Sequence, residues 1–294
     1  MTLMEEVFSV KLGKMKVEIL ATESLGVRSM SCLVTAGSLR ILIDPGVALG
    51  PRRYGLSPHR REVQTLWERW FGIKKALRTA DIVVITHYHY DHFNPQEPGL
   101  FRGKILFVKD PERRINSSQK RRASAFLPEL SGIARIEIAD GRVFSFGGVL
   151  LRFSEPVPHG ETVKRGYVIQ VLVEHGGFRF LHTSDVGGYP LEGQNEFALF
   201  WAPDLIFLDG PSTYMAGGCV PEKAMGNMAE LLRSGRLKKL VVDHHLLRDV
   251  SWKQRVKDLV EEARKRGVDL LTAAEFMGTR EMPLEARRKE LYFR

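Results

Sequence analysis

Short apolar runs, each bounded by glycine, proline or polar residues, recur along the whole chain. Runs of about four to eight residues rich in valine, isoleucine, leucine and phenylalanine are typical of buried strands. Residues 81–86, for example, are Asp-Ile-Val-Val-Ile-Thr. The predicted strands are residues 15–21, 30–35, 39–43, 81–86, 104–108, 134–138, 149–154, 167–173, 178–182, 204–208 and 238–243.

Between these runs, apolar residues recur every three or four positions, as they do in an amphipathic helix. In residues 60–78, the apolar side chains fall on one face, which we expect to pack against the core; they are Val63, Leu66, Trp67, Trp70 and Phe71. The predicted helices are residues 60–78, 112–126, 192–200, 221–233, 251–265 and 283–292.

The order of these elements predicts the fold class. A group of strands followed by helices occurs twice, which is typical of an α/β protein with two sheets packed face to face and helices outside. No low-complexity linker or short repeat divides the sequence, so we expect residues 1–294 to form a single domain. We expect residues 281–294 to form a charged helix on its surface.

The most informative polar residues follow the predicted strand 81–86. They are His87-Tyr88-His89-Tyr90-Asp91-His92. Imidazoles two positions apart at the end of a strand can converge on one cation, and the carboxylate and imidazole just beyond them can bind a second. Four potential ligands in six positions far exceed what nine histidines in 294 residues would give by chance. We therefore interpret this segment as metal-binding rather than as an exposed polar loop.

A site for two metals needs further ligands, and candidates follow other predicted strands. His159 comes after the strand at 149–154, and Asp185 comes after the strand at 178–182. His244 and His245 follow the strand at 238–243, and we prefer His244 because it comes first.

In this order, the residues resemble the five motifs of the metallo-β-lactamase superfamily. The resemblance covers nearly the whole chain and implies a four-layer αβ/βα sandwich of two mixed β-sheets. The matching residues are Asp44 for the first motif, His87 to His92 for the second, His159 for the third, Asp185 for the fourth, and His244 (or His245) for the fifth.

Two stretches resemble a narrower group within this superfamily. Residues 24–30 and 88–90 are similar to those of an uncharacterised, mainly archaeal branch of predicted metal-dependent hydrolases. That closer resemblance brings no known substrate with it.

The superfamily resemblance also implies a role for each motif residue. One ion would be held by His87, His89 and His159, and a second by Asp91, His92 and His244 (or His245), while Asp185 would bridge both. Imidazoles with carboxylate oxygens suit zinc, although iron or manganese would accept the same ligands. We therefore expect two divalent metal ions as cofactors, with zinc favoured.

Two such ions would give the chain a hydrolytic activity. They would lower the pKa of the water between them, so that hydroxide exists at neutral pH, and they would polarise the bond under attack. Asp91 would orient this nucleophile or move its proton, so Asp91 and the bridging Asp185 are the candidate catalytic residues. Cys32 and Cys219 are not needed as nucleophiles, and we expect both to be buried apolar groups.

Three other polar residues could support the ligands or only the fold. Asp44 could accept a hydrogen bond from a ligating imidazole or from the loop at 87–92, or it could simply begin the turn before Pro45. His182 could support the site, although a core histidine is the simpler interpretation. Asp209 ends the predicted strand 204–208 and could equally have either role.

The formal net charge of +9 indicates an acidic partner. We favour a small anionic substrate over nucleic acid, because the basic residues are scattered along the chain as on a charge-rich thermophile surface. Arginine matches phosphate and carboxylate groups well. The candidate substrate-binding residues are Arg52, Arg53, Asn116, Gln119, Arg122 and Arg248.

Nothing in the sequence predicts export or a membrane span. Residues 1–6 lack the basic start and apolar stretch of a signal peptide, and no run approaches the roughly 18 apolar residues of a membrane helix. The two cysteines also argue against a disulfide framework. We therefore expect a cytoplasmic protein without a membrane partner, and the sequence gives no indication of its oligomeric state.

Three functions remain open at this point. The favoured one is a metal-dependent hydrolase that uses a dinuclear-site hydroxide to cleave an ester-like bond in an anionic, phosphate-bearing substrate. The second is a lactone or thioester hydrolase of the same fold. The third is a non-catalytic protein that binds nucleic acid or a partner around a structural metal, because unrelated functions share this scaffold.

Overall fold

The first of two large sheets is built by the N-terminal half of the chain, in a computed structural model that describes residues 10–215 and 217–293. Its strands lie in chain order, antiparallel from β1 to β4 and parallel from β4 to β7. They are β1 (Val10–Leu12), β2 (Met15–Ala21), β3 (Ser31–Ala36), β4 (Leu39–Ile43), β5 (Ile82–Ile85), β6 (Ile105–Val108) and β7 (Arg135–Ile138).

The second sheet has the order β16-β15-β14-β13-β12-β9-β8 and is also mixed. The neighbours from β13 to β16 are parallel, and the remaining pairs are antiparallel. Its strands are β8 (Val143–Phe146), β9 (Val149–Phe153), β12 (Val171–His175), β13 (Phe178–His182), β14 (Leu205–Leu208), β15 (Lys239–Val242) and β16 (Asp269–Leu271). A separate ribbon pairs β10 (Val157–Pro158) with β11 (Tyr167–Val168).

The helices connect the strands and cover the sheets. In the described residues, none of them combines the length and apolarity that crossing a membrane requires. The α-helices are α1 (Arg60–Thr79), α2 (Ser117–Phe126), α3 (Glu196–Trp201), α4 (Glu222–Leu232), α5 (Trp252–Arg255), α6 (Lys257–Arg266), α7 (Ala273–Phe276) and α8 (Arg288–Tyr292). Five 3-10 helices span Glu23–Leu25, Pro98–Phe101, Leu127–Leu130, Val163–Arg165 and Leu246–Arg248 in the described residues.

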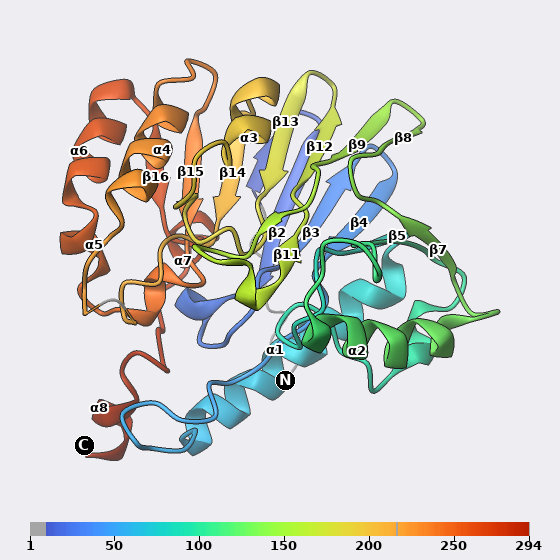
Figure 1. Cartoon of the computed structure of the whole chain (residues 1–294), viewed down its shortest axis with the longest axis horizontal. Coiled ribbons are helices and arrows are strands. Elements are labelled where there is room, and N and C mark those ends of the chain that lie inside the picture. The colour runs from blue at the N-terminus through green and yellow to red at the C-terminus, as the bar shows by residue number, and fades with distance from the viewer. Residues whose placement is uncertain (1–9, 216, 294) are drawn as a thin grey trace, which may run out of the picture.

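Three apolar clusters define four layers. The largest joins the inner faces of the two sheets, as in the pair Ile41 of β4 and Phe180 of β13. A second packs the outer face of the first sheet against α1 and α2, and a third packs the outer face of the second sheet against α4 and α6. Figure 1 shows α4 and α6 to the left of the sheets, α1 below them and α2 at the lower right. The predicted αβ/βα sandwich with helices outside is confirmed.

The strand ends bring the predicted motifs to one edge of this sandwich. The segments that carry Asp44, His87, Asp185 and His244 follow β4, β5, β13 and β15 respectively. These strands belong to the parallel parts of the two sheets. In open α/β sheets, ligands bind outside the carboxyl ends of the strands, and that is where these residues lie.

Several element boundaries differ from the prediction, and the polar contacts explain two of them. The helix predicted from residue 112 begins only at Ser117, because Asp110 accepts hydrogen bonds from the backbone of residues 112 and 113 and holds a turn. The strand predicted at 167–173 is divided at Ile169, whose N–H donates to Thr86 at 3.2 Å. The remaining differences are a helix at Glu196–Trp201 rather than 192–200, a break at Val256 in the helix at 251–265, and four short strands and one helix that were not predicted (β1, β8, β10, β16 and α7).

The predicted buried face of α1 was partly wrong. Trp70, Ile73 and Leu77 face the core, while Trp67 and Phe71 are 63% and 53% exposed. The helix therefore packs through the face that carries Trp70, Ile73 and Leu77, and the face that carries Trp67 and Phe71 is exposed. The expectation that both cysteines are buried holds for Cys32 and is wrong for Cys219, which is exposed.

The C-terminal segment is mostly not helical. The predicted helix at 281–294 is confined to Arg288–Tyr292, and Arg294 lies outside the described residues. The segment is also not only a surface feature, since Arg288 is fully buried and its Nη2 lies 2.8 Å from Glu62 Oε1 of α1. Figure 1 shows α8 beside the loop that precedes α1.

Candidate metal centre

The loop after β5 is anchored by Tyr88 and Phe93, so that its ligand side chains face inward, whereas Tyr90 is 50% exposed. Tyr88 and Phe93 are fully buried, and the Tyr88 hydroxyl donates to the carbonyl of Lys109. Gly46 lies so close to this loop that a Cβ there would be 2.2 Å from the Phe93 nitrogen. Tyr88 and Phe93 therefore anchor the loop, and the polar residues of the loop remain as potential ligands.

The first cluster consists of His87, His89 and His159, which with Asp185 could hold one metal ion. His87 Nε2 lies 3.0 Å from His89 Nδ1, and Asp185 Oδ2 lies 3.1 Å from His159 Nε2 and 3.8 Å from His87 Nε2. A tetrahedral ion with metal–nitrogen distances of about 2.0–2.1 Å separates its ligand atoms by roughly 3.3 Å. The four side chains therefore fit around one such ion.

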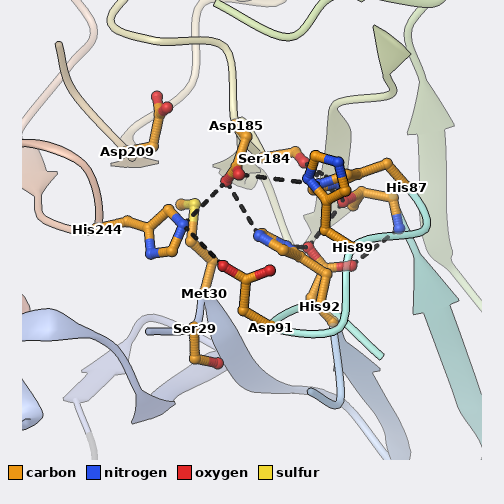
Figure 2. A network of polar contacts seen from close by, with 12 residues as sticks. Ser29, Met30, His87, His89, Asp91, His92, Ser184, Asp185, Asp209 and His244 are labelled. Carbon is orange, nitrogen blue, oxygen red and sulfur yellow. Dashed lines mark hydrogen bonds and ion pairs between the residues drawn. The ribbon is translucent and has the colours of Figure 1, made fainter. Parts of the chain in front are cut away.

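The second cluster consists of Asp91, His92 and His244, which could hold another ion. Asp185 Oδ1 lies 3.1 Å from His92 Nε2 and 3.5 Å from His244 Nε2. His244 Nε2 also lies 3.7 Å from Asp91 Oδ2. Figure 2 shows Asp185 between the two clusters, with His87 and His89 on one side and His244 on the other.

Three buried polar atoms in this centre have no hydrogen-bond partner among the described residues, and two of the three lie close together. These two are His92 Nε2 and Asp185 Oδ1, which approach each other without the geometry of a hydrogen bond. Buried polar atoms are seldom left unsatisfied, because the loss of hydration costs free energy. Atoms that converge in this way are suited to a shared cation, so the residues present fit a metal ion.

The second cluster is supported by carboxylates on its outer side. Asp44 Oδ2 lies 2.8 Å from His92 Nδ1, and Glu23 Oε2 lies 2.7 Å from His244 Nδ1. Each carboxylate accepts the Nδ1 proton, which leaves the Nε2 lone pair directed into the cluster. Asp44 also accepts hydrogen bonds from the N–H and hydroxyl of Thr86, at 2.8 and 2.7 Å.

The outer side of the first cluster carries no such carboxylate in the described residues. His87 Nδ1 lies 3.2 Å from the Thr86 hydroxyl and 3.3 Å from the Ser184 hydroxyl. His159 Nδ1 is buried without a hydrogen-bond partner. The two clusters thus contain similar imidazoles with different supports.

These surroundings separate the pKa values of the imidazoles. Burial lowers the pKa of His87 well below its ordinary value, and burial and His159 lower that of His89 to about 3. Burial acts in the same direction on His92 and His244, but nearby carboxylates outweigh it. Asp185 and Asp44 raise the pKa of His92, and Glu23 and Asp185 raise that of His244 to about 10.

The surroundings of Asp185 and Asp91 favour their charged forms by lowering the pKa of each. Burial disfavours the charged form of Asp185, but His92, His244 and His245 hold its pKa well below the ordinary value. Burial is likewise outweighed at Asp91, whose pKa is lowered by His92 and His244. Asp91 is 19% exposed and is therefore the part of the second cluster that reaches toward solvent.

Three residues of the centre have left-handed backbones although they are not glycine. The φ angles are 50° for Asp44, 58° for Ser184 and 29° for His244. Such conformations cost about 1–3 kcal/mol each and persist where surrounding contacts impose them. Their concentration at the strand ends indicates that the backbone is held in place to aim these side chains.

His245 lies beside His244 but has a different support. Its Nδ1 is 2.7 Å from Asp209 Oδ2, and its Nε2 is 3.7 Å from Asp185 Oδ2. His244 groups with Asp91 and His92, whereas His245 groups with Asp185 and His244. Asp209 therefore supports His245, and it also accepts the N–H groups of residues 187 and 188.

His182 contacts only backbone groups through its two nitrogens. Its Nε2 lies 2.8 Å from the carbonyl of Met30, and its Nδ1 accepts the N–H of Ser184. Both ring nitrogens therefore have backbone hydrogen-bond partners and do not point into either cluster. The side chain supports the turn that carries Ser184 and Asp185.

Sequence reasoning missed two carboxylates of this centre. Glu23 follows β2 and bonds both His244 and Arg248, whose Nε lies 2.6 Å from Glu23 Oε1. Asp243 accepts the N–H groups of Ser24 and His244. Both are acids at or just beyond strand ends, so that position could have marked them as candidates, although it does not reveal their partners.

The predicted substrate-binding residues lie in three different surroundings. Asn116, Gln119 and Arg122 donate to the carbonyls of residues 164, 165 and 88 respectively, and Gln119 is fully buried. They hold loops around the site, and their contacts do not support the predicted phosphate contact. Arg52 is exposed, whereas Arg53 and Arg248 contact each other beside the second cluster.

Comparisons with known proteins match this geometry. Residues 39–245 match the family described as "Beta-lactamase superfamily domain". A UPF0282 protein of Korarchaeum cryptofilum is 44% identical over 283 residues, covering 95% of this chain and 94% of that protein. A UPF0282 protein of Metallosphaera sedula is 45% identical over 287 residues, covering 95% and 93%.

Solved structures with the same fold are less similar to this chain in sequence than the UPF0282 proteins are. Unliganded yeast PDE1 has a TM-score of 0.56 at 13% identity, covering 89% of this chain and 99% of that chain. The metallo-β-lactamase fold protein YhfI from Bacillus subtilis has a TM-score of 0.52 at 13% identity, covering 88% and 95%. At these identities, the likeness shows the fold alone.

Proposed function

The chain belongs to the metallo-β-lactamase superfamily and to its archaeal UPF0282 group, and on that basis we propose that it is a dinuclear metal-dependent hydrolase. Its substrate would be an anionic molecule with an ester-like bond, with a phosphate group favoured. Zinc suits the mixture of imidazole and carboxylate ligands, and iron or manganese would fit the same set.

One observation carries this proposal. The two oxygens of Asp185 face different clusters, Oδ2 toward His87 and His159 and Oδ1 toward His92 and His244. A carboxylate in this position can bridge two ions that share a site. Bound ions would act as Lewis acids and would make a water molecule nucleophilic at neutral pH.

Residues of the chain would orient the water molecule and the metal ligands. Asp91 is partly exposed at the second cluster, and His92 and His244 lower its pKa and so favour its charged form; it could therefore hold and orient a water molecule and accept its proton. The carboxylates Asp44 and Glu23 keep His92 and His244 in the tautomer that presents Nε2. No serine or cysteine nucleophile is required.

The test uses the zinc-loaded protein and the substitution Asp185→Asn. We expect two ions per wild-type chain and fewer than two in the variant, measured by elemental analysis. Hydrolysis of bis(p-nitrophenyl) phosphate should fall by more than the roughly 10- to 100-fold that loss of a ligand's outer partner costs. The matched control is Asp258→Asn, which changes an exposed acid on α6 and should leave both readings unchanged.

The same assay decides between the alternatives. Turnover of lactones or thioesters without turnover of phosphodiesters would move the assignment to a lactone or thioester hydrolase. Two bound ions with no turnover across phosphodiesters, lactones and thioesters would reject the enzyme and favour a structural metal.

A further inference from the structure

The Arg53 guanidinium is held between two aromatic rings and has no carboxylate partner in the described residues. Its Cζ lies 4.7 Å from the ring centre of Tyr54 and 4.6 Å from that of Tyr214. Its Nη2 donates to the carbonyl of Arg248 at 2.8 Å, and its Nε is buried without a hydrogen-bond partner. The Arg53 side chain is half-buried rather than enclosed, so its unneutralised charge is available to an acceptor from outside the chain.

The segments around this cation are fixed by contacts of their own. The Tyr54 hydroxyl donates to the carbonyl of Ala286 at 2.9 Å, and Arg53 and Leu56 exchange two backbone hydrogen bonds. On the other side, the Thr213 hydroxyl donates to Asp249 at 3.0 Å and holds the turn next to Tyr214. A cation that is already ordered loses little conformational entropy when it binds a ligand.

Arg248 connects this cation to the candidate metal centre. Its Nε donates to Glu23, and its Nη1 donates to the Tyr214 hydroxyl at 3.2 Å. Its Nη2 lies 3.1 Å from Nε2 and 3.5 Å from Nδ1 of His244. Such similar distances place the guanidinium over the face of the imidazole, because an atom on the Nε2 lone-pair axis would be much farther from Nδ1.

Two consequences follow from these contacts of Arg248. The Nε2 lone pair of His244 stays free for a metal ion, so Arg248 does not compete with the second cluster. The Tyr214 hydroxyl accepts from Arg248 and keeps its own proton to donate. Arg53 and Tyr214 therefore both offer donors next to the second cluster.

The charges nearby point to an anion. The guanidinium groups of Arg53 and Arg248 both contact the ring of Tyr214, and Glu23 is the one carboxylate in the described residues that forms an ion pair with either. Glu23 is also shared with His244. Arg53 itself pairs with no carboxylate in the described residues, so its charge is one that a phosphate or carboxylate would neutralise.

We propose that Arg53 and Tyr214, backed by Arg248, form a binding subsite for an oxyanion of the substrate that is separate from the bond being cleaved. The substrate class is then an ester-like compound with a second, terminal phosphate or carboxylate. This inference rests on the proposed hydrolase function for its substrate, but the subsite itself can be tested without turnover.

The binding test uses sulfate, an oxyanion, and the zinc-loaded protein in a calorimetric titration. Arg53→Gln should bind sulfate at least roughly tenfold more weakly than the wild type, because it removes a charged donor. Tyr214→Phe should weaken sulfate binding less, and it keeps the test valid if Arg53→Gln does not fold. The control Arg264→Gln makes the same charge change at an exposed position of α6 and should bind like the wild type.

A kinetic test identifies the terminal group. For carboxylate, mono-p-nitrophenyl glutarate is compared with p-nitrophenyl butyrate. For phosphate, p-nitrophenyl thymidine 5′-phosphate is compared with and without a 3′-phosphate. The wild type and Arg264→Gln should prefer the member with the terminal anion in one pair, and Arg53→Gln should lose that preference through a higher KM.

The two tests separate failure of the subsite from failure of the proposed function. Equal sulfate affinity in the wild type and Arg53→Gln, or no sulfate binding at all, would overturn the subsite. Equal use of both members of each pair by the wild type would overturn it as well. If none of the four compounds is hydrolysed, the result counts against the hydrolase proposal, and the sulfate titration alone decides whether the subsite exists.

Discussion

The two clusters of the candidate metal centre contain similar side chains in different surroundings. In the second cluster, His92 and His244 each bond a carboxylate through Nδ1. In the first, as far as the described residues show, His87 contacts only hydroxyl groups on that side, and Nδ1 of His159 has no hydrogen-bond partner. Ligand type alone therefore does not determine how a cluster binds metal, because the outer partner sets the orientation and charge of each imidazole.

The largest effect that this comparison predicts comes from Glu23→Gln. Glutamine keeps the size of the side chain and can still accept from His244 Nδ1, but it removes the negative charge. We expect the second metal ion to bind roughly 10- to 100-fold more weakly, while the first is nearly unaffected. Stepwise zinc affinities from competition with a chelator would measure this.

The control for that substitution is Glu261→Gln, which alters an exposed acid on α6. Because Glu23 also pairs with Arg248, the thermal stability of the metal-free variant should be recorded alongside. Equal weakening of both binding steps would show that the two clusters are not distinguished by their carboxylates.

A smaller difference should appear in the pH dependence of metal binding. Without metal, the carboxylates raise the pKa of His244 to about 10, so at pH 7 it carries a proton that an ion must displace. The affinity of the second cluster should then rise about tenfold per pH unit for each proton released. His89, with a pKa lowered to about 3, is already neutral and releases none.

The proton count can be read from calorimetric titrations in buffers of different ionisation enthalpy between pH 6.5 and 8. We expect at least one proton released by the second ion and close to none from the imidazoles of the first cluster. A steeper pH dependence for the first cluster than for the second would contradict the assignment of supports.

The same comparison explains what could be predicted from the sequence. The loop His87 to His92 was recognisable because strand, anchors and ligands are contiguous, so local spacing alone gives the pattern. His159, Asp185 and His244 come from distant segments, but each follows an apolar strand, and parallel strands end at the same edge.

The supporting residues were harder to predict because their partners are set by packing. Glu23 and His244 are 221 positions apart, and the bond between them depends on how β2 and β15 are placed in different sheets. Likewise, Asn116 and Gln119 had the right chemistry for phosphate, but the fold uses their amides to hold the turn at 164–166. Their spacing in the sequence does not reveal that competition.

The smallest predicted effect concerns the hydroxyl support of the first cluster. Ser184→Ala removes the contacts of the serine hydroxyl with His87 Nδ1 and with the Thr86 hydroxyl, but leaves the Thr86 hydroxyl 3.2 Å from the same nitrogen. A neutral hydrogen bond contributes only about 0.5–1.5 kcal/mol, so we expect the first metal ion to bind a few-fold more weakly. The second ion should bind as in the wild type, because Asp44 and Glu23 remain in place. A loss at the first cluster as large as that of Glu23→Gln at the second would mean that hydroxyls and carboxylates support these imidazoles equally, and the distinction between the two clusters would then fail.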